Sequence, residues 1–157
     1  MLAYSRWWTK PSTFTAVGNG FSTKQAASNP HPVTFDMVQR PIHEDPETIT
    51  VNGVRPRVVT NTADALITFA VCQRSGEPFI AADGTADRSC DSLADVAGRK
   101  VRLAPAATTT IAMTVTPRRA GRVVIRGMDV TYVRGADHLW QRGTQATGMV
   151  VNVKVGD

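Results

Sequence analysis

Apolar and polar residues alternate with a period of two in several short stretches of the chain. Val33, Phe35 and Met37 are separated by polar residues, and the same alternation fills residues 110–116 and 149–155. Successive side chains of a β-strand point to opposite faces, so this pattern is typical of strands with one buried face. No stretch repeats with the 3.6-residue period of a long helix, and the pattern therefore predicts an all-β fold.

Turn-forming residues divide the middle of the chain. Asn52-Gly53 lies between β-forming residues and predicts a hairpin, because a type I′ turn requires positive φ at both central positions. Pro56 cannot donate a hydrogen bond to a neighbouring strand, so we expect it at an edge or a bulge. Residues 61–64 predict a further turn. The apolar run at residues 65–72 that follows predicts a central strand covered on both faces.

The inward-facing positions change parity at Gly127. Val123 and Ile125 are apolar at odd positions, whereas Met128 and Val130 are apolar at even positions. One extra residue at Gly127 would return both sets to the same buried face, because side chains alternate strictly along a strand. The sequence therefore predicts a β-bulge there.

These stretches amount to about seven or eight strands without βαβ alternation, which predicts an antiparallel β-sandwich of two sheets. We place this domain at residues 33–157. Residues 9–32 hold prolines and glycines among Ser, Thr and Asn without a sustained period, which is typical of a linker. We therefore expect residues 1–32 to be an N-terminal remnant followed by a flexible stalk.

Two cysteines, Cys72 and Cys90, flank a polar, glycine-containing stretch. Neither has the spacing of a metal-ligand or Cys-x-x-Cys motif, so we predict a disulfide that ties down a long loop at residues 72–99. The loop could also hold one helical turn around residues 92–96. Such a disulfide would contribute about 3 kcal/mol and would indicate an oxidising, extracytoplasmic compartment. The alternative is a pair of reduced thiols in a cytosolic protein.

The N-terminus resembles the trailing edge of a membrane segment. Residues 1–4 are too short for a signal peptide or a membrane span, but Trp7 and Trp8 follow them, and Trp concentrates at membrane interfaces. We expect an upstream anchoring helix that this chain lacks. The alternative is a simple N-terminus that carries an exposed Trp pair.

The chain is basic, with a formal net charge of +5. Its basic residues are scattered singly along the predicted strands without interleaved aromatics, which argues against nucleic-acid binding. Only Lys10, Lys24, Lys100 and Lys154 among the 18 basic residues are lysines. This arginine bias indicates a GC-rich genome, which explains much of the charge.

The run from Val101 to Gly121, continued by Val130-Thr-Tyr-Val133, resembles the last strands of bacterial immunoglobulin-like and fibronectin-type modules. The resemblance implies an immunoglobulin-like sandwich. More narrowly, several short motifs are similar to those of uncharacterised, single-pass membrane-anchored exported proteins of actinobacteria. They are Trp7-Trp8-Thr9, Gly18-Asn19, the two-cysteine loop, and Tyr132 followed by Gly143-Thr-Gln-x-Thr-Gly148. This second resemblance implies an extracytoplasmic domain that follows a membrane helix, and it carries no known activity.

Few residues could perform catalysis. His31 lies between prolines of the predicted stalk, where we expect it to be solvated, and His43 precedes two acids in a predicted surface turn. No nucleophile elbow, zinc-protease motif or phosphate-binding loop is present. We therefore expect a protein that is not an enzyme, with no catalytic residues, no cofactor and no metal. Loop acids could instead bind calcium, although the spacing of an EF-hand is missing; these are Asp83, Asp87, Asp91 and Asp95.

The connection between the last two predicted strands is the candidate binding loop, with Asp137, His138, Trp140 and Arg142. Trp and Arg are enriched in interface hot spots, and the loops at the ends of a sandwich are common recognition sites. We expect this loop at the same end of the domain as the turn at residues 61–64. The alternative is that Trp140 folds back over the core with Arg142 on its ring face.

The first functional hypothesis is a non-catalytic extracytoplasmic module that supports or recruits an envelope protein through this loop or a sheet face. The second is a module that binds cell-wall glycan, with Trp140 and Tyr132 stacking on sugar rings. A small enzyme is the third. We expect no nucleic-acid partner, and membrane contact only through the missing N-terminal anchor.

Overall fold

The computed structural model describes residues 13–14, 20–38, 45–104, 108–135 and 141–157, and the structural statements below refer to these residues. No helix in this part of the chain is long and apolar enough to cross a membrane. Strands and one short 3₁₀ helix follow one another along it: β1 (Gly20–Gln25), β2 (Val33–Asp36), β3 (Glu47–Asn61), β4 (Leu66–Gln73), β5 (Ala81–Asp83), η1 (Ala86–Arg88), β6 (Ser92–Ala94), β7 (Arg99–Leu103), β8 (Thr109–Thr116), β9 (Gly121–Arg134) and β10 (Arg142–Val155).

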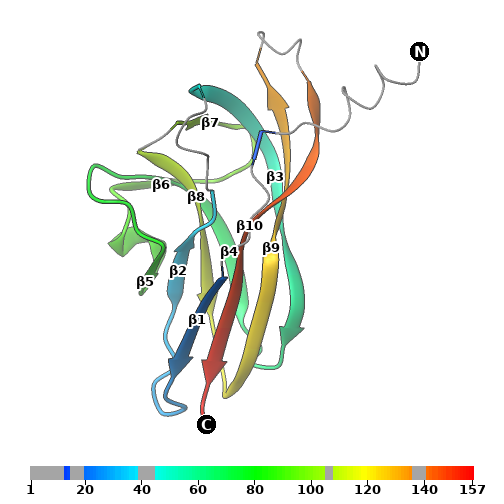
Figure 1. The fold of residues 1–157 in the computed structure, drawn as a ribbon. Coiled ribbons are helices and arrows are strands. Elements are labelled where there is room, and N and C mark those ends of the chain that lie inside the picture. Colours follow the sequence, from blue (N-terminus) through cyan, green and yellow to red (C-terminus); the bar gives the residue numbers. More distant parts are fainter. Residues whose placement is uncertain (1–12, 15–19, 39–44, 105–107, 136–140) are drawn as a thin grey trace, which may run out of the picture.

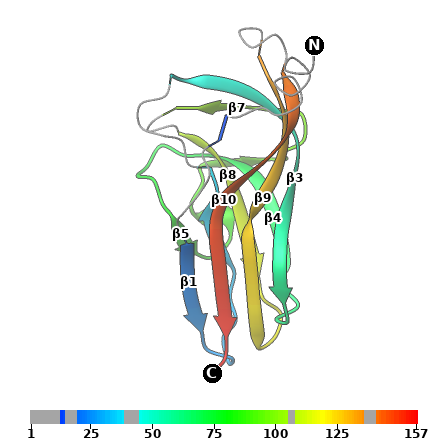
Figure 2. The same cartoon turned by 45° about the vertical axis from the view of Figure 1, so that its right-hand side comes forward.

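The strands form two five-stranded sheets with the orders β1-β10-β9-β3-β7 and β5-β2-β8-β4-β6. Neighbouring strands are antiparallel except for β1, which pairs in parallel with β10. Figures 1 and 2 show β1, β10, β9 and β3 side by side in one layer and β2, β8 and β4 in the other. The predicted all-β, mostly antiparallel two-sheet architecture is confirmed. Short strands that the sequence did not predict raise the strand number above seven or eight.

The hydrophobic core lies between the two sheets and is built from the alternating positions. Met149, Val151 and Val153 of β10 are buried, and their polar neighbours point away from the core. Burial of each such side chain contributes about 1.5–3 kcal/mol. The other large, fully buried side chains include Phe35, Ile49, Ile111, Met113, Ile125 and Tyr132.

The predicted bulge at Gly127 is confirmed. Val123 and Ile125 are buried at odd positions, and Met128 and Val130 are buried at even positions. The pairing register of β9 shifts at this point against both β10 and β3. Gly127 has a φ of 73°, a left-handed conformation that glycine adopts without a steric penalty.

The predicted hairpin at Asn52-Gly53 is wrong. β3 runs straight through these residues, and the register against β9 merely shifts between Val51 and Gly53. Residues on both sides of Gly53 pair with the same long strand, so the non-local pairing overrides the local turn preference. The register shifts again between Pro56 and Val58, which confirms the irregularity expected at the proline.

The prediction that residues 65–72 form a strand covered on both faces is wrong in part. β4 pairs with β8 along its length but with β6 only at Val71–Gln73. In the first half of β4, Leu66 and Thr68 are exposed on the outer face of the sheet, and Leu66 is 48% exposed, whereas Cys72 is fully buried. The helical turn expected around residues 92–96 is also absent from this described segment, because Ser92–Ala94 form β6.

The prediction of an irregular stalk is wrong for Gly20–Gln25, which form β1 at the edge of a sheet. This strand carries Phe21, whose ring packs edge-on against Phe35 with a centroid distance of 5.6 Å. The alternation in β1 is short and mostly of Ser, Thr and Lys, so the sequence offers little hydrophobic signal. The pairing with β10 supplies the order that local propensity does not.

Candidate functional site

The predicted binding loop connects β9 to β10 at one end of the sandwich. Asp137, His138 and Trp140 lie outside the described residues, so the roles assigned to them stay predictions. Arg142 is the first residue of β10 and is exposed to solvent.

The turn at residues 61–64 is confirmed, but it lies at the opposite end of the sandwich from this loop. The Thr62 backbone nitrogen donates to the carbonyl oxygen of Arg122, near the start of β9, at 2.9 Å. Asn61 holds the turn, because its side-chain amide both donates to and accepts from the backbone of Ala65. The expectation that the loop and this turn share one end is therefore wrong.

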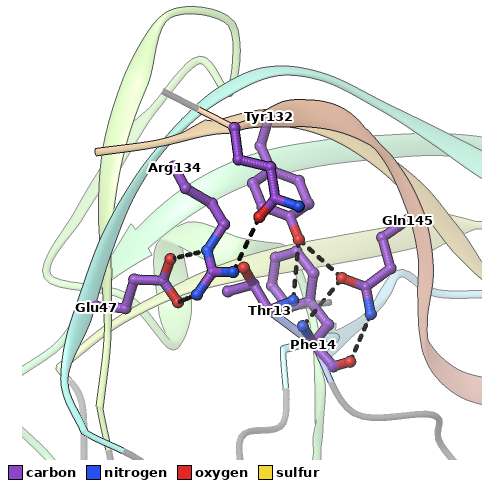
Figure 3. A network of polar contacts seen from close by, with 7 residues as sticks. Thr13, Phe14, Glu47, Tyr132, Arg134 and Gln145 are labelled. Atoms are coloured by element: carbon purple, nitrogen blue, oxygen red, sulfur yellow. Dashed lines mark hydrogen bonds and ion pairs between the residues drawn. The ribbon is translucent and has the colours of Figure 1, made fainter. Parts of the chain in front are cut away.

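Arg134 and Gln141 close the base of the loop. The backbone nitrogen of Arg134 donates to the Gln141 carbonyl oxygen at 2.7 Å, and Nη1 donates to Gln141 Oε1 at 3.0 Å. Nε and Nη2 of Arg134 donate to the two carboxylate oxygens of Glu47 at 2.5 and 3.3 Å (Figure 3). The Glu47 and Arg134 side chains are only 8% and 14% exposed. A bidentate, largely desolvated ion pair thus ties β3 to the base of the loop.

Glu47→Gln is expected to lower the free energy of unfolding by about 2 kcal/mol, because the amide keeps the size of the carboxylate but removes its charge from a buried pair. Urea unfolding measures the change. Glu77→Gln is the matched control, since Glu77 is exposed, and it should change stability by less than about 0.5 kcal/mol. Equal stabilities of the two variants would show that the Glu47–Arg134 pair contributes nothing.

The segment Thr13–Phe14 docks beside this network. Phe14 is 5% exposed, and its ring lies edge-on to Tyr132 with a centroid distance of 5.1 Å. The Phe14 backbone nitrogen donates to Gln145 Oε1 at 3.1 Å, and Gln145 Nε2 donates to the Phe14 carbonyl oxygen at 2.5 Å (Figure 3). Although the sequence places these two residues in a stalk, they are packed against β9 and β10 at the loop end.

Tyr132 is fully buried at the centre of this network, so the prediction that it stacks on a sugar ring is wrong. Its hydroxyl donates to Gln145 Oε1 at 2.8 Å and accepts from the Thr13 backbone nitrogen at 3.1 Å. Burial raises the pKa of the Tyr132 hydroxyl above its ordinary value. The hydroxyl therefore stays protonated near neutral pH, in the form that can donate to Gln145.

Tyr132→Phe is expected to cost about 1 kcal/mol at pH 7, because it removes the hydroxyl from two partners. The pKa of Tyr132 is higher in the folded than in the unfolded state, so its protonated form stabilises the fold below pH of about 10. This contribution is lost as the pH rises through the folded pKa. The free energy of unfolding of the variant should therefore fall less steeply above pH of about 10. An identical alkaline loss in both proteins would contradict this assignment.

Cys72 and Cys90 form the predicted disulfide, with an S–S distance of 2.00 Å and a Cα–Cα distance of 5.4 Å. Both cysteines are buried and pack with Ala86 and Ala112 in a small apolar cluster. The bond ties the segment that carries η1 and β6 to β4. A disulfide of this kind is typical of an oxidising, extracytoplasmic environment.

A buried ion pair supports the same segment. Arg74 Nη1 donates to Asp36 Oδ2 at 3.0 Å, and Thr110 Oγ1 donates to Asp36 Oδ1 at 2.5 Å. The Arg74 guanidinium also lies 5.5 Å from the ring centroid of Phe79. Asp36 lies on β2, Thr110 on β8 and Arg74 just after β4, so no local pattern in the sequence indicates the cluster. Its polar groups are mutually satisfied, which fits a supporting role.

The His31 side chain is 36% exposed, so it is solvated only in part, and it also contacts protein groups. Nε2 lies 3.4 Å from Asp83 Oδ1, and Nδ1 lies 3.0 Å from the Asn29 carbonyl oxygen. A shallow pocket of about 360 Å³ adjoins them and is also lined by Arg88. His43 and His138 lie outside the described residues, so the possibility that two histidines meet in one pocket stays untested.

The four loop aspartates have separate surroundings. A hydrogen bond from the Thr85 side chain, followed by one from the Asp87 backbone, lowers the pKa of Asp87. Asp91 accepts from the Ser75 backbone nitrogen at 2.5 Å, and Asp83 faces His31. Among the described residues, no group of three or more His, Cys, Asp or Glu side chains is arranged to hold a metal ion.

The sheet β1-β10-β9-β3-β7 gathers the basic residues that the sequence shows only singly. Exposed arginines and lysines occur at its outward-facing positions on all five strands. We call this outer surface the basic face and define it by nine residues: Lys24, Arg55, Arg57, Lys100, Arg102, Arg122, Arg126, Arg142 and Lys154. The sequence signal for these residues is their alternation with buried residues along β7, β9 and β10.

No protein-family model matches the chain, and a search of curated protein sequences finds no match.

Proposed function

We propose that this protein is a non-catalytic, extracytoplasmic immunoglobulin-like module that binds an envelope protein at the loop end of its sandwich. The observation that carries the proposal is the buried bracing of that end by Glu47, Arg134 and Gln141. The confirmed disulfide supports the extracytoplasmic location. The two packed, mostly antiparallel sheets support the immunoglobulin-like assignment.

Two antiparallel strands can be joined by a short hairpin that needs no buried ion pair beneath it. Desolvating a carboxylate and a guanidinium is costly, and their attraction offsets this cost only when the geometry is good. Here Arg134 reaches both the Glu47 carboxylate and the Gln141 amide, which lies at the far end of the loop. Recognition sites need such supporting contacts, because a loop fixed before binding loses less conformational entropy on binding.

The N-terminal segment reinforces the same end. Phe14 and Gln145 form two main-chain to side-chain hydrogen bonds, and Thr13 is fixed by the Tyr132 hydroxyl. Side chains from β3, β9 and β10 and the segment Thr13–Phe14 therefore lie together at this end of the sandwich (Figure 3). Arg142, exposed beside this rigid base, offers a planar donor fork to a partner.

Glycan binding is the weaker candidate because Tyr132 is buried and offers no ring face to a sugar. The glycan hypothesis then depends on Trp140 alone, a residue outside the described part of the chain. No contact among the described residues favours it over protein binding.

Site-specific photocrosslinking in the host tests the proposal. A benzoylphenylalanine replaces Arg142, and in a control protein it replaces Leu66, which is 48% exposed at the opposite end of the sandwich. We expect one discrete crosslinked protein in the envelope fraction from position 142 and none from position 66. The crosslink should weaken in the Glu47→Gln background, because the loop base is then loosened.

Two results would overturn the proposal. One is the absence of any crosslinked protein from position 142 in a protein that is folded and exported. The other is the same set of crosslinked species from positions 142 and 66, since that pattern reports non-specific proximity.

A further inference from the structure

The basic face has a row of three cations that lie directly opposite one another on adjacent strands. Lys24 of β1 pairs in register with Lys154 of β10, and Lys154 pairs in register with Arg122 of β9. Directly opposed like charges destabilise a sheet. In the described part of the chain, no ion pair to a carboxylate relieves this row, and the Arg122 Nε donates instead to the neutral Asn152 Oδ1 at 2.9 Å.

The other cations of the basic face extend along the whole sheet. Arg126 lies further along β9, Arg55 and Arg57 lie on the middle of β3, and Arg142 starts β10 at the far end. Arg122 and Val133, the partner of Arg142, are eleven residues apart on β9, which corresponds to about 36 Å at the rise of a strand. The basic surface is therefore much longer than one small anion.

Acidic residues are concentrated elsewhere. On the described strands of this sheet, Asp129 is the one acidic residue that faces outward among the cations. Its Oδ1 lies 3.9 Å from Arg57 Nε. A genome rich in arginine codons explains the number of arginines but not their collection on one side of the molecule. Five of the acids lie in the segment between β4 and β7, on or beside the other sheet: Glu77, Asp83, Asp87, Asp91 and Asp95.

The shape of the basic face selects among anionic partners. Adjacent strands of a sheet are rotated by about 20–25°, so five strands turn the face through most of a right angle. A flat membrane can touch only part of such a surface, whereas a flexible chain can follow it. The middle of the face has a shallow depression of about 360 Å³ that includes Gly53, Arg55 and Asp129.

We propose that the basic face binds a flexible linear polyanion of the envelope that carries repeated phosphate groups. Six of the nine cations are arginines, whose planar forks match phosphate oxygens in a bidentate way. Each exposed contact is weak, but contacts along one chain add through high effective concentration. The row of Lys24, Lys154 and Arg122 lies at the opposite end of this surface from the loop, and the basic face and the loop end share only Arg142.

Titration of the disulfide-bonded protein with fluorescent long-chain polyphosphate tests the proposal at several salt concentrations. We compare Lys24→Gln/Lys154→Gln with Arg88→Gln/Arg118→Gln. Both double variants lower the formal net charge of +5 by the same two units, but Arg88 and Arg118 lie outside the basic face. The face variant should bind about tenfold more weakly at about 0.15 M salt, and the slope of log K against log salt should fall by about 1.5. The control should bind nearly as the wild type.

Three comparisons make the outcome decisive. Inorganic phosphate should not compete at equal phosphate concentration, and polyglutamate and anionic lipid vesicles should bind more weakly than polyphosphate. Equal weakening in the two double variants would overturn the proposal, because it would reflect net charge alone. Stronger binding to polyglutamate would identify an acidic polypeptide as the partner instead, and stronger binding to vesicles would identify a membrane. Thermal unfolding of both variants controls for folding.

Discussion

Gly127→Ala is expected to lower the free energy of unfolding by about 2–5 kcal/mol. Gly127 has a φ of 73°, where a residue with a Cβ costs about 1–2 kcal/mol. A Cβ at this position would also lie 2.3 Å from the backbone oxygen of Thr147 on β10. Backbone atoms cannot rotate away as a side chain does, so the strands must move apart and lose packing, which costs about 1–3 kcal/mol more.

Gly53→Ala is the matched control for this prediction. Gly53 also lies at a register shift against β9, but an added Cβ would meet no atom within 4 Å, and its φ is not positive. We expect its unfolding free energy to stay within about 0.5 kcal/mol of the wild type. Chemical denaturation compares the variants. Equal stabilities of the two variants would show that the bulge does not require a glycine at position 127.

Removal of the disulfide is expected to cost about 3 kcal/mol. Cys72 and Cys90 are separated by 18 positions, and a closed loop of this length restricts the unfolded chain by about that amount in the loop-entropy model. Cys72→Ala/Cys90→Ala should therefore unfold at a lower urea concentration than the oxidised wild type.

Reduced wild-type protein is the control for the double variant. It keeps both sulfur atoms, so it separates the effect of the covalent bond from the effect of lost buried volume. Reduced wild type should lose most of the same stability. If oxidised and reduced proteins unfold at the same urea concentration, the bond contributes no stability.

Much of the fold could be predicted because the relevant signals are local. The parity change at Gly127 follows from side-chain alternation, which any strand must obey. The turn at residues 61–64 is fixed by the Asn61 side chain, which bonds the backbone of Ala65. The disulfide follows from two cysteines that flank one loop. Each of these features depends on residues close together in the sequence.

The errors arise where pairing between distant residues decides the structure. Asn52-Gly53 has the local preference of a hairpin turn, but β3 remains continuous because β9 pairs with it on both sides of Gly53. β1 has little hydrophobic signal and is ordered by β10. A strand partner chosen across the whole chain can outweigh a local preference of about 1 kcal/mol.

The candidate sites were predicted less well for the same reason. Glu47 and Arg134 are far apart in the sequence, so nothing near either residue indicates that they form a buried pair. Lys24, Lys154 and Arg122 each occur singly, and only the register of three strands places them in one row. These basic residues are scattered singly along the chain, whereas the sheet brings residues of neighbouring strands together.

Both proposed partners, an envelope protein and an envelope polyanion, require that the domain lies outside the cytoplasm. This location is tested most directly by the redox state of Cys72 and Cys90 in protein recovered from its own host. Cells are quenched with acid and treated with a thiol-alkylating reagent without reductant, and the intact protein is then weighed by mass spectrometry. We predict an unalkylated protein that is lighter by two hydrogen atoms than its reduced form. Alkylation of both cysteines would contradict the account, because the domain would then reside in a reducing compartment.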